Sequence, residues 1–155
     1  MRGDGNGWIR CAQGHRHWGL NGAAGLLLRR TGQYGAMPSV LMQHRAAWTS
    51  DGDTWGIPGG ARDSHETFAQ AALREAAEEA GIESSAVRVV DEWVDDHGGW
   101  SYVTVIADAI AALTIVANAE SAELRWVPEP VIDALALHPG FARTWPSVRS
   151  DPPGR

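Results

Sequence analysis

The stretch from Gly60 to Ile82 reads GARDSHETFAQAALREAAEEAGI and decides the fold of this chain. A glutamate follows Gly60 after five residues, and an Arg-Glu pair follows after seven more. Ala76, a pair of glutamates and a closing Gly-Ile complete the pattern. Because alanine and glutamate favour helix and Gly81 suits a helix C-cap, the stretch predicts a helix over about Thr67–Ala80 between two loops.

Three glutamates on this predicted helix are suited to hold a divalent cation. Glu75, Glu78 and Glu79 are three and four residues apart, so their side chains share one edge of the helix. Like charges at this spacing cost roughly a few tenths of a kcal/mol per pair. A hard cation such as Mg²⁺ offsets that cost because it prefers oxygen ligands and binds substrate phosphates as well. The pattern therefore favours attack by water on a phosphoanhydride.

A plain solvated helix is the alternative interpretation of AALREAAEEA, with Arg74 and Glu78 as an ordinary surface pair. The flanking residues argue against it. A Pro58-Gly59-Gly60 turn precedes the stretch, Glu66 lies at a fixed offset, and Gly81 closes the helix. A plain solvated helix does not require these three features to occur together.

The complete pattern resembles the Nudix box, G-x5-E-x7-R-E-U-x-E-E-x-G-U, in which U is aliphatic, with Ala76 and Ile82 at the U positions. The resemblance implies an enzyme that hydrolyses nucleoside diphosphates linked to another moiety, with Mg²⁺ or Mn²⁺ as cofactor. It also implies an α/β fold, an α/β/α sandwich with a mixed sheet and a loop–helix–loop catalytic motif. Strand and helix signals along the chain agree with such a sandwich.

Position by position, the resemblance implies that Glu78 and Glu79 bind the metal. Glu75 is implied to be a further ligand or the base that acts on the attacking water, and a backbone carbonyl near Gly59 is expected to join the ligands. Two residues are implied to fix the loop against the helix through a salt bridge rather than to perform chemistry: Arg74 and Glu66.

Residues outside the box are weaker candidates. Glu120 and Glu123 are the preferred extra acids, with a polar strand entrance as their alternative role. Asp95 and Asp96 are second choices, because hairpin aspartates commonly form turns. Eight tryptophans are too many to serve as ligand contacts, so most are expected to pack in the core. The proposed substrate contacts are Trp55, His65, Trp100 and Tyr102.

Composition bounds the remaining possibilities. The 155 residues are 44% hydrophobic and 21% charged, which is typical of one globular domain. A formal charge of −6 disfavours binding to duplex nucleic acid. A single cysteine, Cys11, excludes an intrachain disulfide, and no run is apolar enough for a signal peptide or a membrane span. We therefore expect a cytoplasmic protein, with a homodimer possible because Nudix relatives are often dimers.

The chain divides into an irregular lead-in over residues 1–20, one Nudix domain over 21–150 and a frayed tail over 151–155. Within the domain, hydrophobic runs and turn residues predict six strands and three helices. Strands are expected at Gly22–Arg30, Ser39–His44, Thr54–Ile57, Val87–Val94, Ser101–Ile110 and Glu123–Val127. Besides the box helix, helices are expected at Glu129–Leu137 and Phe141–Val148, with His138 breaking or capping a helix. Cys11, His15 and His17 resemble part of a zinc site, but three ligands from one short loop fit a tetrahedron poorly.

The substrate is the least determined property. The proline that ADP-ribose pyrophosphatases of this family carry after the box is absent, and so is the SQPWPFPxS-like stretch of NADH pyrophosphatases. The remaining branch is compact and MutT-like, which implies a nucleoside triphosphate pyrophosphohydrolase that clears oxidised or non-canonical nucleotides. Sugar nucleotides, dinucleoside polyphosphates and a non-catalytic nucleotide-binding regulatory module are the alternatives. A purely structural protein is also open, and it would show no metal-dependent stability.

Overall fold

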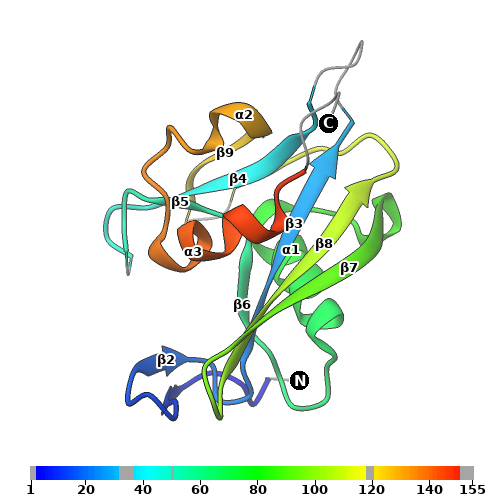
Figure 1. Cartoon of the computed structure of the whole chain (residues 1–155). Helices are drawn as coiled ribbons and strands as arrows, with labels where there is room; N and C mark the ends of the chain where they lie inside the picture. The colour runs from blue at the N-terminus through cyan, green and yellow to red at the C-terminus, as the bar shows by residue number, and fades with distance from the viewer. Residues whose placement is uncertain (1–2, 32–36, 50, 118–120, 151–155) are drawn as a thin grey trace.

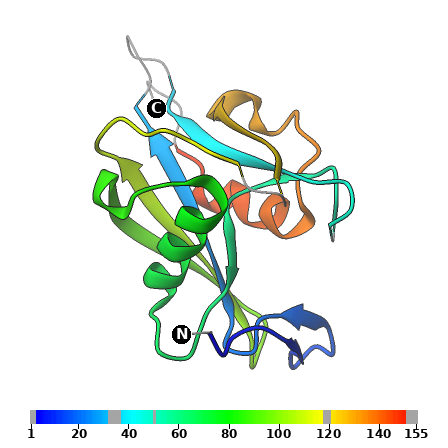
Figure 2. The same ribbon diagram turned by 180° about the vertical axis from the view of Figure 1, so that it is seen from behind.

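A seven-stranded mixed sheet runs through the middle of the computed structural model, which describes residues 3–31, 37–49, 51–117 and 121–150 (Figure 1). One helix, α1 (Phe68–Ala80), covers one face, and α3 (Pro139–Val148) covers the other (Figures 1 and 2). The predicted α/β/α sandwich is therefore confirmed. The strands are β3 (Ala23–Arg30), β4 (Ser39–Arg45), β5 (Trp55–Gly56), β6 (Gly59–Ala61), β7 (Val87–Asp96), β8 (Ser101–Ala109) and β9 (Ser121–Pro128).

Strand β3 lies at the centre and explains the two-sided core. It pairs in parallel with β8 along almost its whole length, and successive side chains point to opposite faces. Leu26 and Leu28 pack on the α1 side, whereas Leu27 packs on the α3 side, and all three are fully buried. A strand covered on both faces carries a continuous apolar run, which is the GLLL pattern of this sequence.

Helix α1 forms where the spacing of small residues predicts it. The Thr67 side chain accepts a hydrogen bond from the Gln70 backbone N–H at 3.0 Å, and the Gln70 side chain accepts one from the Thr67 N–H at 2.9 Å. Gly81 ends the helix with φ 69°. Ala72, Ala76 and the other small residues on one side are fully buried, so the helix packs closely on the sheet.

On one side of β3, two different strands share the pairing, and one of them carries the first residues of the box. Strand β4 pairs with β3 only at Arg29 and Arg30, while β6 pairs with Ala23–Gly25 at the other end. The Pro58-Gly59-Gly60 segment was expected to be only a turn, and Gly59–Ala61 instead forms β6. It can do so because Gly59 has no side chain, which lets its backbone lie against Ala24 and Gly25.

The N-terminal segment corrects the prediction of an irregular lead-in. Strands β1 (Trp8–Arg10) and β2 (Arg16–Trp18) form an antiparallel hairpin beside the β7–β8 turn (Figure 1). Trp8 and Trp18 lie opposite each other with ring centroids 5.2 Å apart, and the Arg16 guanidinium lies over the Trp8 ring. Strands of three residues are too short to show alternation, so no local sequence pattern predicts their pairing.

Of the two C-terminal helices, α3 ends at Val148 as predicted and begins two residues earlier, whereas α2 is shorter than predicted. Helix α2 spans only Glu129–Ile132, because the following chain turns back to pair with β5. The Trp55 N–H donates to the Ala136 carbonyl at 2.7 Å, and the His138 N–H donates to the Trp55 carbonyl at 2.7 Å. His138 caps α3, as one of its predicted roles, by accepting the Gly140 N–H on Nδ1 at 3.1 Å. All predicted strands agree with the observed bounds to within two residues.

A buried ion pair fastens α2 to β3. Glu129 is fully buried and accepts hydrogen bonds from Arg29 Nε at 3.1 Å and from the Ser150 N–H at 2.8 Å. Arg29 also donates to the Val148 carbonyl at the end of α3. The pair therefore links both C-terminal helical segments to the central strand.

We expect Glu129→Ala to lower the free energy of unfolding by about 3–5 kcal/mol, because it leaves the Arg29 charge buried without its carboxylate. Denaturant unfolding of the variant and the parent measures this difference. The matched control is Asp108→Ala, which breaks the exposed pair with Arg88 (N–O 3.4 Å) and should cost at most about 1 kcal/mol. Equal losses in the two variants would show that burial does not set the cost.

Candidate active site

Arg74 on α1 holds the loop of the box against the helix. Its Nε donates to Glu66 Oε2 at 2.7 Å and its Nη2 donates to Glu66 Oε1 at 2.9 Å, which is a bidentate pair. Nη2 also donates to the Ala61 carbonyl of β6 at 3.0 Å. The Glu66 carboxylate in turn accepts the Asp63 N–H at 3.0 Å. One guanidinium thus joins helix, loop and strand, which is the orienting role that the resemblance implies.

This contact changes the acidity of both partners. The hydrogen bond from Arg74 lowers the pKa of the Glu66 carboxyl, and the Asp63 N–H adds to that effect against the opposing effect of burial. Hydrogen bonding to Glu66 raises the pKa of the Arg74 guanidinium above its ordinary value, with Glu75 contributing as well. Both groups are therefore held in their charged forms.

Sequence reasoning missed one member of this network, Asp63. Its side chain accepts the Gly5 N–H at 2.9 Å, and Oδ2 lies 3.7 Å from Arg74 Nη2. Asp63, His65 and Glu66 also present potential ligand atoms within 4.8 Å of one another. Arg74 faces that group. We therefore interpret Asp63 as part of the brace, by which we mean Arg74, Glu66 and the neighbouring groups that hold the box loop against α1. The box pattern leaves residues 61–65 unspecified, so it gives no signal for Asp63.

The three box glutamates lie on one edge of α1 at graded depth. Glu79 is buried, with 9% of its surface exposed, and Oε2 accepts the Gly59 N–H of β6 at 3.0 Å. Glu75 Oε1 accepts from Arg74 Nη1 at 2.8 Å. Glu78 is the most exposed of the three, and its Oε2 lies 3.5 Å from Arg74 Nη1. The edge therefore extends from Glu79, which contacts β6, to Glu78, which is exposed to solvent.

Gly60 is required where β6 faces this edge. A Cβ built on Gly60 would lie 2.6 Å from Cδ of Glu75 and 2.7 Å from its Oε2. Real Cβ atoms do not approach other heavy atoms so closely, so any side chain here would push the Glu75 carboxylate aside. The glycine of the box thus leaves room for a carboxylate, in addition to permitting the turn.

The donor set fits a hard divalent cation. All the side-chain donors on the edge are carboxylate oxygens, which Mg²⁺ and Mn²⁺ prefer. Among the described residues, however, Glu75, Glu78 and Glu79 are not a group whose ligand atoms all lie within 4.8 Å of one another. Arg74 Nη1 lies beside Glu75 and Glu78, whereas Glu79 turns toward the Gly59 N–H of β6.

Tyr102 on β8 lies under this edge, whereas the other aromatic candidates pack elsewhere. Burial raises the pKa of the Tyr102 hydroxyl, and the Glu79 charge raises it further. Trp55 is buried in the α3-side core and stacks on His44, with ring centroids 4.7 Å apart. Trp100 is buried against the hairpin and donates its indole N–H to the Gly19 carbonyl at 3.0 Å. His65 is exposed in the box loop.

The candidate acids outside the box have other contacts. Glu120 lies outside the described residues. Glu123 Oε2 accepts from Arg125 Nη2 at 2.7 Å. Asp95 Oδ2 accepts from Arg143 Nη2 at 2.9 Å. Asp96 accepts the Gly98 N–H at 2.8 Å, which is the turn-forming role considered for it.

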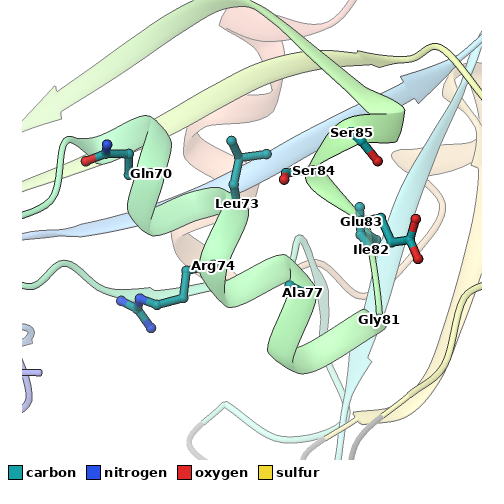
Figure 3. A pocket seen from close by; sticks show the side chains of 9 residues that line it. All are labelled: Gln70, Leu73, Arg74, Ala77, Gly81, Ile82, Glu83, Ser84 and Ser85. Carbon is teal, nitrogen blue, oxygen red and sulfur yellow. The ribbon is translucent and has the colours of Figure 1, made fainter. Parts of the chain in front are cut away.

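Two surface hollows are lined by residues other than the three glutamates. The larger, of about 730 Å³, follows the outer side of α1 to the short helix η1 (Ser84–Ala86). Figure 3 shows Arg74 and Glu83 at opposite ends of it, pointing away from each other. The smaller hollow, of about 270 Å³, is lined by Trp126, Arg30 and residues 109–113. The geometry of the glutamates, rather than either hollow, therefore defines the candidate site.

Comparison with known proteins shows the family of this chain. The NUDIX domain family model matches residues 20–147. A Mycobacterium tuberculosis H37Rv protein named "Putative 8-oxo-dGTP diphosphatase 3" is 51% identical over 158 residues, covering 98% of this chain and 72% of the relative. A Bifidobacterium longum "Nucleoside triphosphate pyrophosphatase/Nudix hydrolase fusion protein" is 44% identical over 146 residues, covering 92% of this chain and 30% of the relative.

A solved structure shows the same fold at similar identity. The Nudix hydrolase RenU of M. smegmatis superposes with a TM-score of 0.87 at 50% identity, covering 93% of this chain and 92% of that chain. This chain therefore belongs to the Nudix hydrolase family. Within that family its class is that of the MutT-like nucleotide pyrophosphohydrolases. None of the described helices is long and apolar enough to cross a membrane.

We expect Glu66→Gln to lower the free energy of unfolding at pH 7 by about 1–3 kcal/mol, because Arg74 loses a charged acceptor. The folded-state pKa of Glu66 is lowered, so its contribution is fully present above its ordinary pKa of about 4.3 and is lost as pH falls through the folded value. Denaturant unfolding from pH 7 to pH 3.5 or so should thus show the difference shrinking on the acid side. A difference that grows on acidification would contradict this assignment. Glu83→Gln, exposed and outside the network, is the control.

Proposed function

We propose that this enzyme hydrolyses nucleoside triphosphates to nucleoside monophosphate and pyrophosphate, with Mg²⁺ or Mn²⁺ as cofactor. Oxidised guanine nucleotides such as 8-oxo-dGTP are the proposed substrates. The observation that carries the proposal is the edge of α1, where a buried Glu79 is held by β6 beside two further glutamates. The M. tuberculosis relative, named for 8-oxo-dGTP, supports this substrate class at 51% identity.

The residue roles follow from depth and contacts. Glu79 and Glu78 would hold the cation, and the carbonyl of Gly59 in β6 would be a backbone ligand. Glu75 serves as a further ligand or as the base that accepts the proton of the attacking water. The hydrogen bond from Arg74 Nη1, at 2.8 Å, keeps the Glu75 carboxylate oriented. Arg74 and Glu66 position the edge and do not touch substrate.

The cation, when bound, would neutralise the phosphates and lower the pKa of a water molecule. The reaction adds a water molecule across the phosphoanhydride bond: its oxygen forms a new bond to phosphorus, the bridging P–O bond breaks, and the proton goes to a carboxylate of the edge. Tyr102 stays protonated beneath Glu79 because its pKa is raised. It therefore contributes a neutral hydroxyl group rather than a charge.

Two alternatives remain for the experiment to separate. A sugar nucleotide or a dinucleoside polyphosphate presents the same diphosphate to the same glutamates. A non-catalytic nucleotide-binding module needs no complete set of carboxylates, and the set here is complete. Cytoplasmic location, a homodimer and the lack of binding to duplex nucleic acid stay predictions.

A nucleotide screen tests the proposal. We expect 8-oxo-dGTP and related nucleoside triphosphates to be consumed with Mg²⁺ or Mn²⁺, releasing pyrophosphate, and we expect no turnover with chelator. Glu79→Gln should remove most of this activity and keep the parent melting temperature, because an amide oxygen can still accept the Gly59 N–H. Glu83→Gln is the matched control and should retain activity. Consumption of sugar nucleotides or dinucleoside polyphosphates alone would refute the triphosphate assignment.

We expect Gly60→Ala to lower kcat by about 100-fold, because the new Cβ displaces the Glu75 carboxylate and misplacement by about an ångström has effects of that size. The melting temperature should change little, since the displaced atoms are the end of a flexible side chain. Steady-state kinetics and thermal unfolding measure the two quantities. Gly56→Ala is the control, because its nearest neighbour would be the His138 Cβ at an ordinary 3.5 Å. Parent-like kcat in Gly60→Ala would remove Glu75 from the reaction.

A further inference from the structure

A second cluster of potential metal ligands lies between the N-terminal hairpin and the β7–β8 turn. Cys11, His17 and His97 each present one ligand atom, and these three atoms lie within 4.8 Å of one another. Cys11 follows β1, His17 lies in β2, and His97 lies in the turn after β7. The sequence suggested Cys11, His15 and His17 from one loop, but the fold replaces His15 with a histidine from a distant segment.

The backbone fixes the two halves of this cluster together. The Ala12 N–H donates to the Gly98 carbonyl at 2.7 Å, which joins the hairpin to the β7–β8 turn. Gly98 has φ +75°, and a Cβ there would lie 2.6 Å from the Ala12 Cβ. Only glycine allows both the turn and this close approach. The Cys11 carbonyl accepts the Gly14 N–H at 2.9 Å, so the segment that carries the thiol is a closed turn.

His17 has a buried nitrogen without a partner. Its ring stacks flat on Trp100, with centroids 4.0 Å apart and planes 6° apart. Within the described part of the chain, its Nε2 atom is buried and no hydrogen bond reaches it. Buried polar atoms in proteins are nearly always satisfied, so each exception calls for an explanation such as an ion or a water molecule. Among the described residues Trp145 Nε1 is a second exception, but an indole N–H can only donate and is not a metal ligand.

His97 carries the carboxylate contact that metal-binding histidines usually have. Its Nε2 lies 3.0 Å from Asp95 Oδ2 and 3.4 Å from Arg143 Nη2. In the tautomer that donates the Nε2 proton to Asp95, the lone pair lies on the other ring nitrogen. Asp95 also accepts from Arg143 Nη2 at 2.9 Å, so the positive charge nearest the cluster is already paired. The contact with Asp95 orients the imidazole ring.

We propose that Cys11, His17 and His97 form a zinc site that fastens the N-terminal hairpin to the sheet. A thiolate and two imidazoles are ligands that Zn²⁺ favours and that Mg²⁺ does not. In a tetrahedral zinc site, bond lengths of about 2.0–2.3 Å place ligand atoms about 3.3–3.6 Å apart. The cluster therefore needs to contract by little more than about an ångström. A water molecule would take the fourth position.

This site uses different elements and a different metal chemistry from the glutamates of α1, so it goes beyond the proposed hydrolysis. The alternative is that a buried cysteine and a stacked histidine simply pack in a small core. That alternative predicts no thiolate-bound metal, and spectroscopy with Co²⁺ distinguishes the two.

The experiment adds Co²⁺ alone to the reduced full-length protein in the presence of excess Mg²⁺, which occupies carboxylate sites. We expect a thiolate-to-cobalt charge-transfer band that saturates at one cobalt per chain and is bleached by Zn²⁺. Carboxylate ligands cannot produce this band. Zinc that remains after gel filtration, measured by elemental analysis, should also approach one atom per chain.

Variants assign the ligands. Cys11→Ser should abolish the band, and His97→Gln should weaken cobalt binding at least about tenfold, while Asp95→Asn should weaken it about 10- to 100-fold through the histidine. His15→Gln is the matched control, since His15 lies in the same turn outside the cluster, and it should bind as the parent does. Circular dichroism confirms that each variant is folded. The Co²⁺ spectrum of the parent protein tests the proposed site even where a variant fails to fold.

Two results would overturn the proposal. The first is the absence of a charge-transfer band in the parent protein at saturating Co²⁺. The second is zinc at one atom per chain that persists in Cys11→Ser but disappears in Glu79→Gln, because the metal would then belong to the box. Either result is distinguishable from failure of the hydrolase proposal, which is read from nucleotide turnover.

Discussion

The bidentate contact between Arg74 and Glu66 is the interaction on which the site depends. It ties the box loop to α1, and the same guanidinium reaches the Ala61 carbonyl and the Glu75 carboxylate. A helix edge crowded with like charges is unfavourable alone. The positive Arg74 side chain lies beside Glu75 and Glu78, so it offsets part of this repulsion and orients those two carboxylates. The hydrolase chemistry is thus built on an ion pair that takes no part in bond breaking.

Close backbone approach is the second constraint. Strand β6 can lie against β3 and under α1 because its first two residues are glycines, so the opening of the sheet is filled by backbone. Glu79 gains a backbone donor there and Glu75 gains space. The small alanines of α1 bring the helix near enough for both contacts. The short distance between α1 and the sheet, more than the identity of the residues on the helix edge, brings the glutamates into the arrangement of a site.

The same physical rule applies at the other end of the molecule. Gly98 lets the β7–β8 turn approach the hairpin, and this approach assembles Cys11, His17 and His97. A stacked histidine with an unsatisfied nitrogen is costly to bury unless a partner is supplied. The protein would then combine a hard-cation site for phosphates with a soft-ligand site that stabilises the fold.

The sequence by itself determined the family, the box helix with its cap, the central buried strands and the identities of the glutamates, because these depend on local spacing and on continuous apolar runs. It could not reveal β1 and β2, which are too short to show alternation, or the early end of α2, which is set by pairing with β5. Only the tertiary structure decided that Trp55 and Trp100 are packed in cores, that Asp63 joins the brace, and that His97 rather than His15 meets Cys11. Such contacts join residues far apart in the chain, and no local pattern encodes them.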